Sequence, residues 1–542
     1  MCSTPLIRIN HNRLVNCLLV IIIQLCLQFP IYSQQIADFT SIEPHVQDSY
    51  FHLPETHTFQ YIIEEGDLLT EGGRLPGKPD FTGFVPENGN SSNKGFLSIN
   101  SELSPGGITI LEVAYDFVRG WEVLKSEAVN FNNVQGTANN CSGTVTPWST
   151  IISCEEVVSA DNNGDGYNDM GWAIEIDPVT KSVVDQNGGL TGGDKLWALG
   201  NFQHENVVIH PNLRTVYQGR DHANGYLFKF VADVEKTLSQ GALYVYKGSK
   251  SGSGEWLRVN NSTPAEQNST IEQCVNLDAT IFSGIEDVEI SPIDGKIYVA
   301  VKAENKVFRF TDSDPISGTT VTNFETYVGD QNYEIDYGSG SISTPWGTGN
   351  DNLAFDNQGN LWVFQDGSDN YIWLVKKEHT IQNSSVELFG IAPFGAEPTG
   401  ITFSPDNRFM FMSIQHPHAG NNSTNQLDAF GNLKPFDKSV TIVVARKEDL
   451  GSEVTSTSKN FRNEIILFPN PATRGQNLVI ENDQIKNITL INTIGVEITV
   501  EHLRKNKATS ITLPTQLNYG IYYLEIEFFN GNFATEKIIL RK

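Results

Sequence analysis

Acidic residues recur at one position of a repeated unit in this 542-residue chain. Four segments, which begin near Glu205, Glu286, Asp351 and Thr399, share a first strand, a tight turn and a second strand. The first three open with an acid six positions before the turn residue, and Glu397 lies just ahead of the fourth. Because a buried, unpaired charge is costly, acids gathered in this way need cations or protons between them. The pattern therefore predicts a metal site, although strand-end acids that face water would fit the same residues.

Charged residues also end the second strands of these units. Arg220, Lys302 and Asp366 each follow the second apolar run of a segment, and Asp287 stands directly after Glu286. A cation beside an acidic group can neutralise the carboxylates or bind an anionic substrate. Arg220 and Lys302 are therefore candidate catalytic residues, with ordinary surface charge as the alternative interpretation.

The segment of residues 139–169 combines sulfur with carboxylates. Cys154 is followed at once by two glutamates, of which Glu155 is the first. A thiolate beside carboxylates suits a redox-capable or borderline cation, which accepts soft and hard ligands together. Three cysteines lie after the first 34 residues, so at least one thiol is left outside a disulfide within the chain. A disulfide from Cys141 to Cys154 or to Cys274 is the alternative.

The same segment contains a partial calcium-loop pattern. Oxygen-bearing side chains stand at its positions 1, 3, 5 and 9, namely at Asp161, Asn163, Asp165 and Asp169. This spacing is that of calcium-binding loops, but a tryptophan stands at position 12, where such loops have a glutamate. The pattern predicts a structural calcium site, with a simple polar turn as the alternative.

The elements that must position these residues are short strands. Alternating apolar residues broken by Pro, Asn, Asp and Gly turns recur along the middle of the chain, and no helical periodicity of any length competes with them. Repeated meanders of three or four strands are typical of a β-propeller with long inserted loops. The first strand of each blade lines the central channel, so acids at equivalent positions converge at one of its mouths. A β-sandwich or a β-helix is the main rival.

The two ends of the chain differ from the middle. In residues 1–34, Arg8 and Arg13 precede an apolar stretch that is short for a membrane span. This layout is typical of a cleaved secretory signal, with an uncleaved membrane anchor as the alternative. Residues 35–447 hold the repeats, and residues 448–462 form a polar linker. Alternating strands over residues 463–542 predict a small β-sandwich.

Composition narrows the classes of partner. The chain has 64 Asp and Glu against 37 Lys and Arg, a formal net charge of −27. The first 34 residues contain no acid, and the residues from 463 onward hold equal numbers of acids and bases, so the excess lies in the middle. Such a charge argues against a nucleic acid, because phosphates would be repelled. Metal ions remain the favoured partners.

The C-terminal residues resemble the sorting domains of proteins exported by the type IX secretion system. The pieces that carry this resemblance are Phe468-Pro469-Asn470-Pro471, Asn492 with Gly495, Gly520-Ile521-Tyr522-Tyr523 and the closing Lys537–Lys542. The resemblance implies an address read by the secretion machinery. Together with the signal, it implies a secreted or cell-surface protein that passes through the periplasm and meets a membrane only by surface attachment.

The middle of the chain, from about residue 37 to 447, resembles the PhoX-type alkaline phosphatases. The matching pieces are Asn140-Cys141-Ser142-Gly143 with Thr146-Pro147-Trp148, Cys154-Glu155-Glu156, Phe202-Gln203-His204-Glu205, Glu286-Asp287, Asp351–Asp356 with Gly359–Trp362, Asp366-Gly367, and Glu397 with Phe403–Asp406 and Gln415-His416-Pro417. They occur in this order along the chain. Thr144 and Ser149 depart from the family pattern, which has glycines there, and no adjacent arginine pair precedes the apolar stretch of the signal.

This resemblance implies a six-bladed propeller that hydrolyses phosphate monoesters at alkaline pH and releases inorganic phosphate. It also implies a cofactor of ferric iron (Fe3+) and calcium, with a cysteine thiolate on iron. The implied metal ligands are Cys154, Glu155, Glu205, Glu286, Asp287, Asp351, Asp366 and Glu397. The rival hypotheses are a non-catalytic, calcium-stabilised propeller that binds surfaces, and another metal-dependent propeller hydrolase, such as a lactonase or a phytase-like enzyme.

Overall fold

The computed structural model describes residues 35–186, 195–451, 467–480, 485–492, 497–500, 502–505, 508–528 and 533–541. The chain divides into a large unit, Met1–Glu453, and a small unit, Val454–Lys542. The predicted signal lies outside the described residues, and so do residues 452–466, which include most of the predicted linker. Within the described ranges, no helix is both long and apolar enough to cross a membrane.

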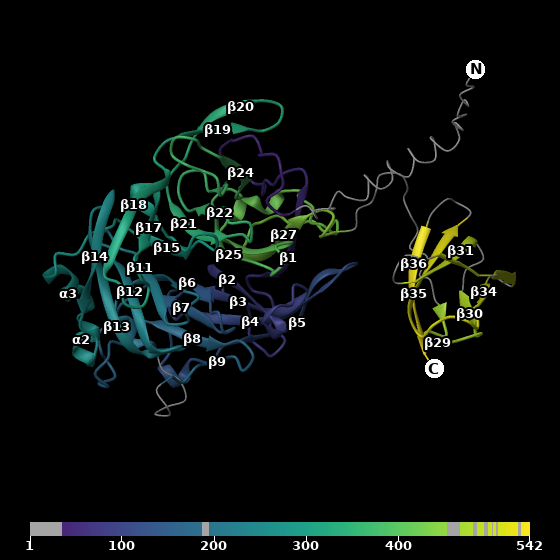
Figure 1. Ribbon diagram of the computed structural model, residues 1–542, viewed down its shortest axis with the longest axis horizontal. Coiled ribbons are helices and arrows are strands. Elements are labelled where there is room, and N and C mark those ends of the chain that lie inside the picture. Colours follow the sequence, from purple (N-terminus) through teal and green to yellow (C-terminus); the bar gives the residue numbers. More distant parts are fainter. Residues whose placement is uncertain are drawn as a thin grey trace, which may run out of the picture. The chain divides into compact units, whose positions relative to one another are not determined.

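Antiparallel meanders of four strands build most of the large unit (Figure 1). In each, a strand pairs with the next one along the chain, because short turns rich in Pro, Asn, Asp and Gly separate the apolar runs. The first three meanders are β2 (Pro79–Pro86), β3 (Lys94–Ser101), β4 (Gly107–Asp116) and β5 (Gly120–Ala128); β6 (Asn140–Val145), β7 (Ile151–Glu155), β8 (Ala173–Asp177) and β9 (Ser182–Val183); and β10 (His204–Ile209), β11 (Thr215–Arg220), β12 (Leu227–Val234) and β13 (Thr237–Gly248).

The second half of the large unit repeats this design. Its strands are β15 (Ile285–Ile290), β16 (Ile297–Val301), β17 (Lys306–Asp312) and β18 (Thr320–Gly329); β21 (Asn350–Phe355), β22 (Leu361–Gln365), β23 (Tyr371–Val375) and β24 (Val386–Ile391); and β25 (Glu397–Phe403), β26 (Phe409–Gln415), β27 (Val440–Arg446) and β1 (His57–Glu64). One extra strand, β14 (Gly252–Val259), pairs with both β13 and β18 and joins two meanders into a nine-stranded sheet. A separate hairpin consists of β19 (Asn332–Asp336) and β20 (Ser341–Pro345).

In the described part of the large unit, the helices are short and lie in the loops. A capping box at Thr263 and Glu266 starts α2, the first of the two α-helices found there. The helices are α2 (Pro264–Asn268), α3 (Thr270–Asn276), and the 3₁₀ turns η1 (Glu87–Gly89), η2 (Asn132–Val134), η3 (Trp197–Leu199), η4 (Lys302–Glu304) and η5 (Ala419–Ser423). The described part of the protein is thus nearly all β, as the sequence predicts.

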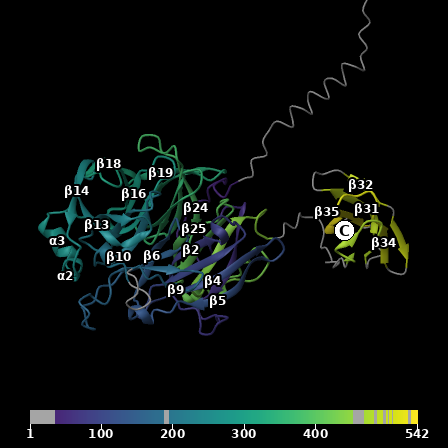
Figure 2. The same ribbon diagram turned by 60° about the horizontal axis from the view of Figure 1, so that its bottom comes forward.

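Two contacts close the large unit on itself. Strand β1 pairs with β27 from the far end of the unit, with His57 opposite Arg446 (Figure 1). The first strands of the meanders also pack in a closed ring, in the order β2, β6, β10, β15, β21, β25 and back to β2. Figure 2 labels four of them, β10, β6, β2 and β25, side by side. This ring is the architecture of a β-propeller, and it supports the predicted six blades, a number that stays a prediction.

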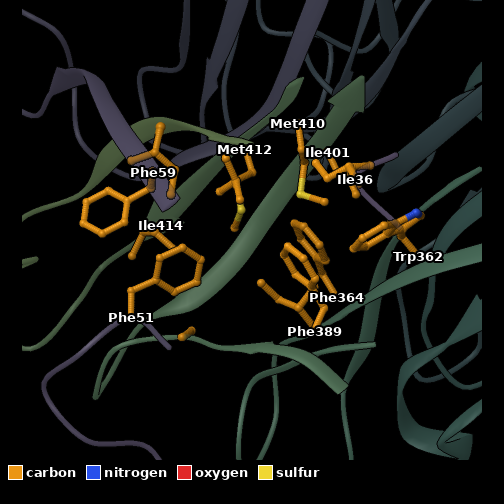
Figure 3. Close-up of a cluster of buried hydrophobic side chains, with 14 of the residues drawn as sticks. Ile36, Phe51, Phe59, Trp362, Phe364, Phe389, Ile401, Met410, Met412 and Ile414 are labelled. Atoms are coloured by element: carbon orange, nitrogen blue, oxygen red, sulfur yellow. The ribbon is translucent and has the colours of Figure 1, made fainter. Parts of the chain in front are cut away.

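The core of the large unit lies between neighbouring sheets. Figure 3 shows one hydrophobic cluster in which Trp362, Phe364 and Phe389 from one sheet face Met410 and Met412 from the next. All five side chains are fully buried, and other buried clusters fill the spaces between further sheets. Because strands covered on both faces bury every side chain, they read as continuous apolar runs in the sequence.

The small unit is a sandwich of two sheets, as predicted. One contains β28 (Leu467–Phe468), β30 (Asn477–Ile480), β34 (Ala508–Thr512) and β33 (His502–Lys505); the other contains β29 (Ala472–Thr473), β36 (Phe533–Arg541), β35 (Gly520–Phe528), β31 (Ile485–Asn492) and β32 (Glu497–Thr499). Alternate apolar residues of both sheets, such as Leu478, Leu490 and Leu524, form its core. Gly495 and Lys542, which carry part of the resemblance, lie outside the described residues.

Gly400 makes a close approach between two first strands. Its φ is +50°, and a Cβ atom there would lie 2.3 Å from the backbone of Asp80 and of Thr82 in β2. We expect Gly400→Ala to lower the free energy of unfolding by about 3 kcal/mol, because strain and a backbone clash add up. Urea unfolding measures this change. Gly431→Ala is the control, since Gly431 has φ +76° but nothing within 4 Å of its Cβ position. Equal losses in the two variants would contradict the predicted clash.

Candidate metal centre

Every first strand of the ring breaks its regular pairing with the second strand at the same place. The register shifts at residues 80–81 of β2, 141–142 of β6, 205–206 of β10, 286 of β15, 351–352 of β21 and 400–401 of β25. A β-bulge leaves its residues unpaired and re-aims a side chain. Five of the six irregularities carry an acid or a thiol, and these are Asp80, Cys141, Glu205, Glu286 and Asp351.

These side chains meet. Their ligand atoms lie within 4.8 Å of one another in overlapping groups of three. The groups are Asp80, Cys141 and Glu205; Glu205, Glu286 and Asp351; Glu156, Glu205 and Asp221; and Asp351, Asp366 and Glu397. Glu205 belongs to three groups and Asp351 to two, so the four groups form one continuous set, called here the central acid cluster. The convergence expected of Glu205, Glu286 and Asp351 is therefore present.

Burial and like charge make the cluster costly without cations. Burial, followed by neighbouring carboxylates, raises the pKa of Asp80, Glu205 and Glu286 well above the usual range. The same causes raise the pKa of Glu156 to about 8. Burial also raises the pKa of Asp351 to about 6, although Lys302 opposes this shift. These carboxyl groups suppress one another's ionisation, and a bound cation can take the place of their protons and neutralise the carboxylates.

The thiol of Cys141 joins sulfur to this oxygen-rich set. Its Sγ lies 3.2 Å from Oδ2 of Asp80 and donates a hydrogen bond to it. Burial, and then Asp80 and Glu205, raises the pKa of the thiol well above its ordinary value. Two buried oxygens of the cluster, Oδ1 of Asp80 and Oε1 of Glu286, have no hydrogen-bond partner in the described part of the chain. Orphaned oxygens beside a thiol are a donor set that fits metal ions.

Two cationic side chains border the cluster. Nζ of Lys302 lies 2.9 Å from Asp366 and 3.6 Å from both Glu286 and Asp351. Burial opposes the charge of Lys302, but these three acids outweigh it and raise its pKa. Nε2 of His416 lies 3.4 Å from Oε1 of Glu397, and this contact raises the pKa of His416 to about 9. Both side chains are part-exposed, so an anion could reach them from solvent.

The comparison with protein families decides the identity of the chain. The family described as alkaline phosphatase PhoX matches residues 117–418, more than half of the sequence. The chain belongs to the PhoX alkaline phosphatase family. It is thus a phosphatase of a metal-dependent family, as the sequence resemblance predicts.

Comparisons with solved structures bear on the fold. The PhoX of Pseudomonas fluorescens, solved with vanadate, a transition-state analogue, is 19% identical with a TM-score of 0.59, and the match covers 76% of this chain and 98% of that one. This likeness supports the fold. A luciferin-regenerating enzyme gives a weaker match, 9% identical with a TM-score of 0.37, over 72% of this chain and 98% of its own. None of the curated proteins compared with the chain matches it. A secretion system C-terminal sorting domain matches residues 466–541, which indicates secretion or a cell-surface location.

Two residues expected to bind metal in this PhoX chain lie elsewhere. Cys154 is on β7, opposite Ala173, and is fully buried in a hydrophobic cluster that includes Phe202. Both oxygens of Glu155 are occupied: Oε1 accepts from Lys195 at 2.7 Å and from Thr137, and Oε2 accepts from the N–H groups of residues 171 and 172. Neither belongs to a metal-ligating group in the ranges described. Cys141 thus lies among the acids and Cys154 does not, while both oxygens of Glu155 are used in hydrogen bonds. A metal-bound thiolate at Cys154 and a metal ligand at Glu155 stay predictions.

Asp287 and Arg220 are also turned away from the acids. Oδ2 of Asp287 accepts from the N–H of Leu353 at 2.7 Å, and Asp287 lines a cavity of about 540 Å³ whose wall also holds the turn residues of the first strands. Arg220 donates to Gln203 Oε1 at 2.8 Å and to the carbonyl of Asn224 at 2.9 Å. Arg220 thus holds the loop that carries Asp221, and among the described residues no salt bridge joins it to the central acid cluster.

The predicted calcium loop is held by its own hydrogen bonds. Asp161 accepts from the N–H groups of residues 164 and 166, while Asp165 accepts from the side chain of Asn163. Both oxygens of Asp169 accept from Asn162. These contacts form a polar turn, and calcium at this loop stays a prediction.

Sequence reasoning missed four members of the cluster. Asp80 and Cys141 each stand six residues before a proline, at Pro86 and Pro147, which is the offset that identified Glu205. The same spacing would have found both, but their segments resemble the repeat too weakly to be aligned with it. Asp221 directly follows a second strand, as Asp366 does, and Glu156 directly follows Glu155. Nothing in the sequence marks Asp221 and Glu156 as members of the cluster, and only their contacts in the structure do so.

Proposed function

We propose that the protein is a secreted phosphomonoesterase whose central acid cluster holds iron and calcium. The single observation that carries this proposal is the meeting of five bulge residues from five first strands, four of them acids and one a cysteine. Within it, the group of Asp80, Cys141 and Glu205 offers sulfur and oxygen together, which suits iron. The groups around Glu286, Asp351 and Glu397 offer oxygen alone, which suits calcium. When bound, such cations supply the positive charge that phosphoryl transfer needs.

The chain's own cations have roles beside this centre. Lys302 keeps a positive charge between three carboxylates. When metal ions neutralise those carboxylates, its ammonium can bind an oxygen of the phosphate ester. The contact with Glu397 raises the pKa of His416, so its Nε2 is a candidate to donate a proton to the leaving alkoxide. Arg220 positions the loop of Asp221 and does not bind substrate in this proposal.

Lys302→Met tests the first of these roles. Without the ammonium, the site has one positive charge fewer to attract the anionic substrate. We expect the KM for an aryl phosphate to rise roughly tenfold, with a smaller change in kcat. Lys306→Met is the matched control, because Lys306 pairs with the exposed Asp330 and lies outside the cluster. An unchanged KM in Lys302→Met would remove this residue from substrate binding.

Export completes the proposal. Residues 1–34 act as a signal for passage into the periplasm, and residues 463–542 are read by the type IX secretion machinery, with residues 448–462 as the linker between the enzyme and its address. The partners of the mature enzyme are a phosphate-ester substrate and this machinery. Cleavage of both ends, measured by mass spectrometry of protein recovered outside the cell, tests these boundaries.

The decisive experiment combines metal content with activity. Elemental analysis of the purified protein is expected to find iron and calcium, and the protein is expected to absorb visible light through its thiolate–iron bond and to hydrolyse an aryl phosphate. Vanadate, which stands in for a transition state in the Pseudomonas fluorescens enzyme, is expected to inhibit it. A colourless, iron-free protein that cleaves a lactone but no phosphate ester would instead support the lactonase alternative.

A further inference from the structure

A second group of metal-ligating side chains lies in the N-terminal segment of the large unit, away from the central acid cluster. Ligand atoms of His45, Asp48 and His52 lie within 4.8 Å of one another. The three residues belong to one stretch of eight residues that precedes β1. Their side chains are part-exposed, with 30% of His52 and 51% of Asp48 open to solvent. A cation can therefore reach them directly from solution.

The contacts within this group orient both imidazoles and leave Nε2 of His45 free to bind an ion. Nε2 of His52 lies 2.8 Å from Oδ1 of Asp48, and the rings of His45 and His52 are 4.4 Å apart at 84°. Nδ1 of His45 faces the carbonyl of Val46 at 2.7 Å. Because a carbonyl only accepts, Nδ1 carries the proton in this contact and Nε2 keeps its lone pair, which is the arrangement of a metal-binding histidine.

The backbone that carries the group is fixed rather than free. Nε2 of Gln47 donates to the carbonyls of Ala392, Pro393 and Ala396, at 3.3, 3.0 and 2.8 Å. The N–H of Phe394 donates to the carbonyl of Asp48, and the backbone of His52 pairs with Ile391. The segment is therefore hydrogen-bonded to the loop that precedes β25. Since its ligands are already held in place, little ordering is needed when a cation binds.

We propose that His45, Asp48 and His52 form a second metal site that binds a borderline divalent cation such as Zn²⁺. Two imidazoles and one carboxylate are ligands that Zn²⁺ and its neighbours prefer, whereas calcium prefers oxygen alone. Three protein ligands leave a fourth position of a tetrahedral ion open to water. The bound ion would fix the conformation of the N-terminal segment, whose Gln47 and Asp48 contact the loop that precedes Glu397.

Titration with Zn²⁺ in excess calcium tests the site on the full-length protein. The protein used is loaded with iron as well as calcium, so that both the sulfur-containing group and the oxygen-rich groups of the central acid cluster are filled and the calorimetric signal reports the histidine group. We expect one equivalent of Zn²⁺ to bind, and His45→Gln or Asp48→Asn to weaken this binding at least ~10-fold. Both variants keep the backbone contacts and the size of the side chain. His418→Ala is the control, because His418 is exposed and lies outside the group.

Hydrogen exchange supplies a second readout that does not depend on enzyme activity. Zn²⁺ is expected to slow exchange of the Phe394 amide in the parent protein, since that N–H donates to the carbonyl of Asp48. In His45→Gln, Zn²⁺ is expected to leave the exchange rate of this amide unchanged. Binding that is equally tight in His45→Gln and in the parent protein would overturn the proposal, as would a parent protein that binds no Zn²⁺ when calcium is in excess.

Discussion

Cys141→Ser is expected to abolish the visible absorption of the protein and to lower its phosphatase activity at least ~100-fold. The thiol lies 3.2 Å from Asp80 and shares a ligand group with Asp80 and Glu205, so it supplies the sulfur of the proposed iron site. A serine hydroxyl keeps the hydrogen bond to Asp80 but is a far poorer ligand for a soft or borderline cation. Absorption spectra, iron content and turnover of an aryl phosphate measure the three losses together.

Cys154→Ser is the matched control for this experiment. Cys154 is fully buried against apolar side chains, so a serine there destabilises the fold by about 1–3 kcal/mol through its unpaired hydroxyl. The folded fraction of this variant should keep its colour, its iron and its activity. The opposite outcome, a bleached Cys154→Ser and a coloured, active Cys141→Ser, would return the thiolate to Cys154 and refute the assignment made here.

The difference between the two cysteines shows how far the sequence could predict this site. The propeller and the acids Glu205, Glu286 and Asp351 follow from the repeat, and the sandwich follows from the alternating strands of the C-terminal residues, because strand, turn and strand leave a periodic pattern in the residues. The choice of Cys154 followed the two glutamates beside it in the sequence. Strand pairing favours the other cysteine: Cys154 stands in the regular ladder of β7 and points into the core, whereas Cys141 stands in a bulge.

Bulges are what sequence patterns describe least well. A bulge shifts the alternation of side chains by one residue, so a residue expected to face the core faces the channel instead. Asp80 and Cys141 reach the cluster in this way. At the sixth irregularity the chain places Gly400, and the acid of that strand comes instead from Glu397, three residues earlier. The repeat therefore predicts a ring of ligands. It does not predict that β25 places a glycine at its bulge, where β2 comes close, and supplies Glu397 in its place.

Raising the pH is expected to destabilise the protein once a chelator has removed its cations. Burial raises the pKa of Glu397 to about 8; the hydrogen bond from His416 opposes this rise and the charge of Asp366 adds to it. Burial also raises the pKa of Glu156 to about 8 and that of Asp351 to about 6. A carboxyl whose pKa is higher in the folded than in the unfolded protein binds its proton more tightly when folded. Its contribution to stability is full below the unfolded pKa, near 4.5 for Glu, and is lost as the pH rises through the folded pKa.

The expected size of this effect is set by these three groups. At about 1.4 kcal/mol per pKa unit, and with allowance for their coupling, the free energy of unfolding should fall by at least about 3 kcal/mol between pH 5 and pH 9. Urea unfolding in chelator at several pH values measures the slope. Glu397→Gln removes one titrating group, so this variant should show a shallower slope than the parent protein.

Bound cations should reverse the dependence, because they bind carboxylates and not carboxylic acids. Alkaline pH ionises Glu156, Asp351 and Glu397 together, and only then does the cluster offer its full negative charge to metal ions. The metal-loaded protein should therefore be most stable at alkaline pH, where the chelated protein is least stable. Identical slopes with and without cations would mean that the cluster does not hold them. Opposite slopes would link the family's alkaline chemistry to the suppressed ionisation of its own ligands.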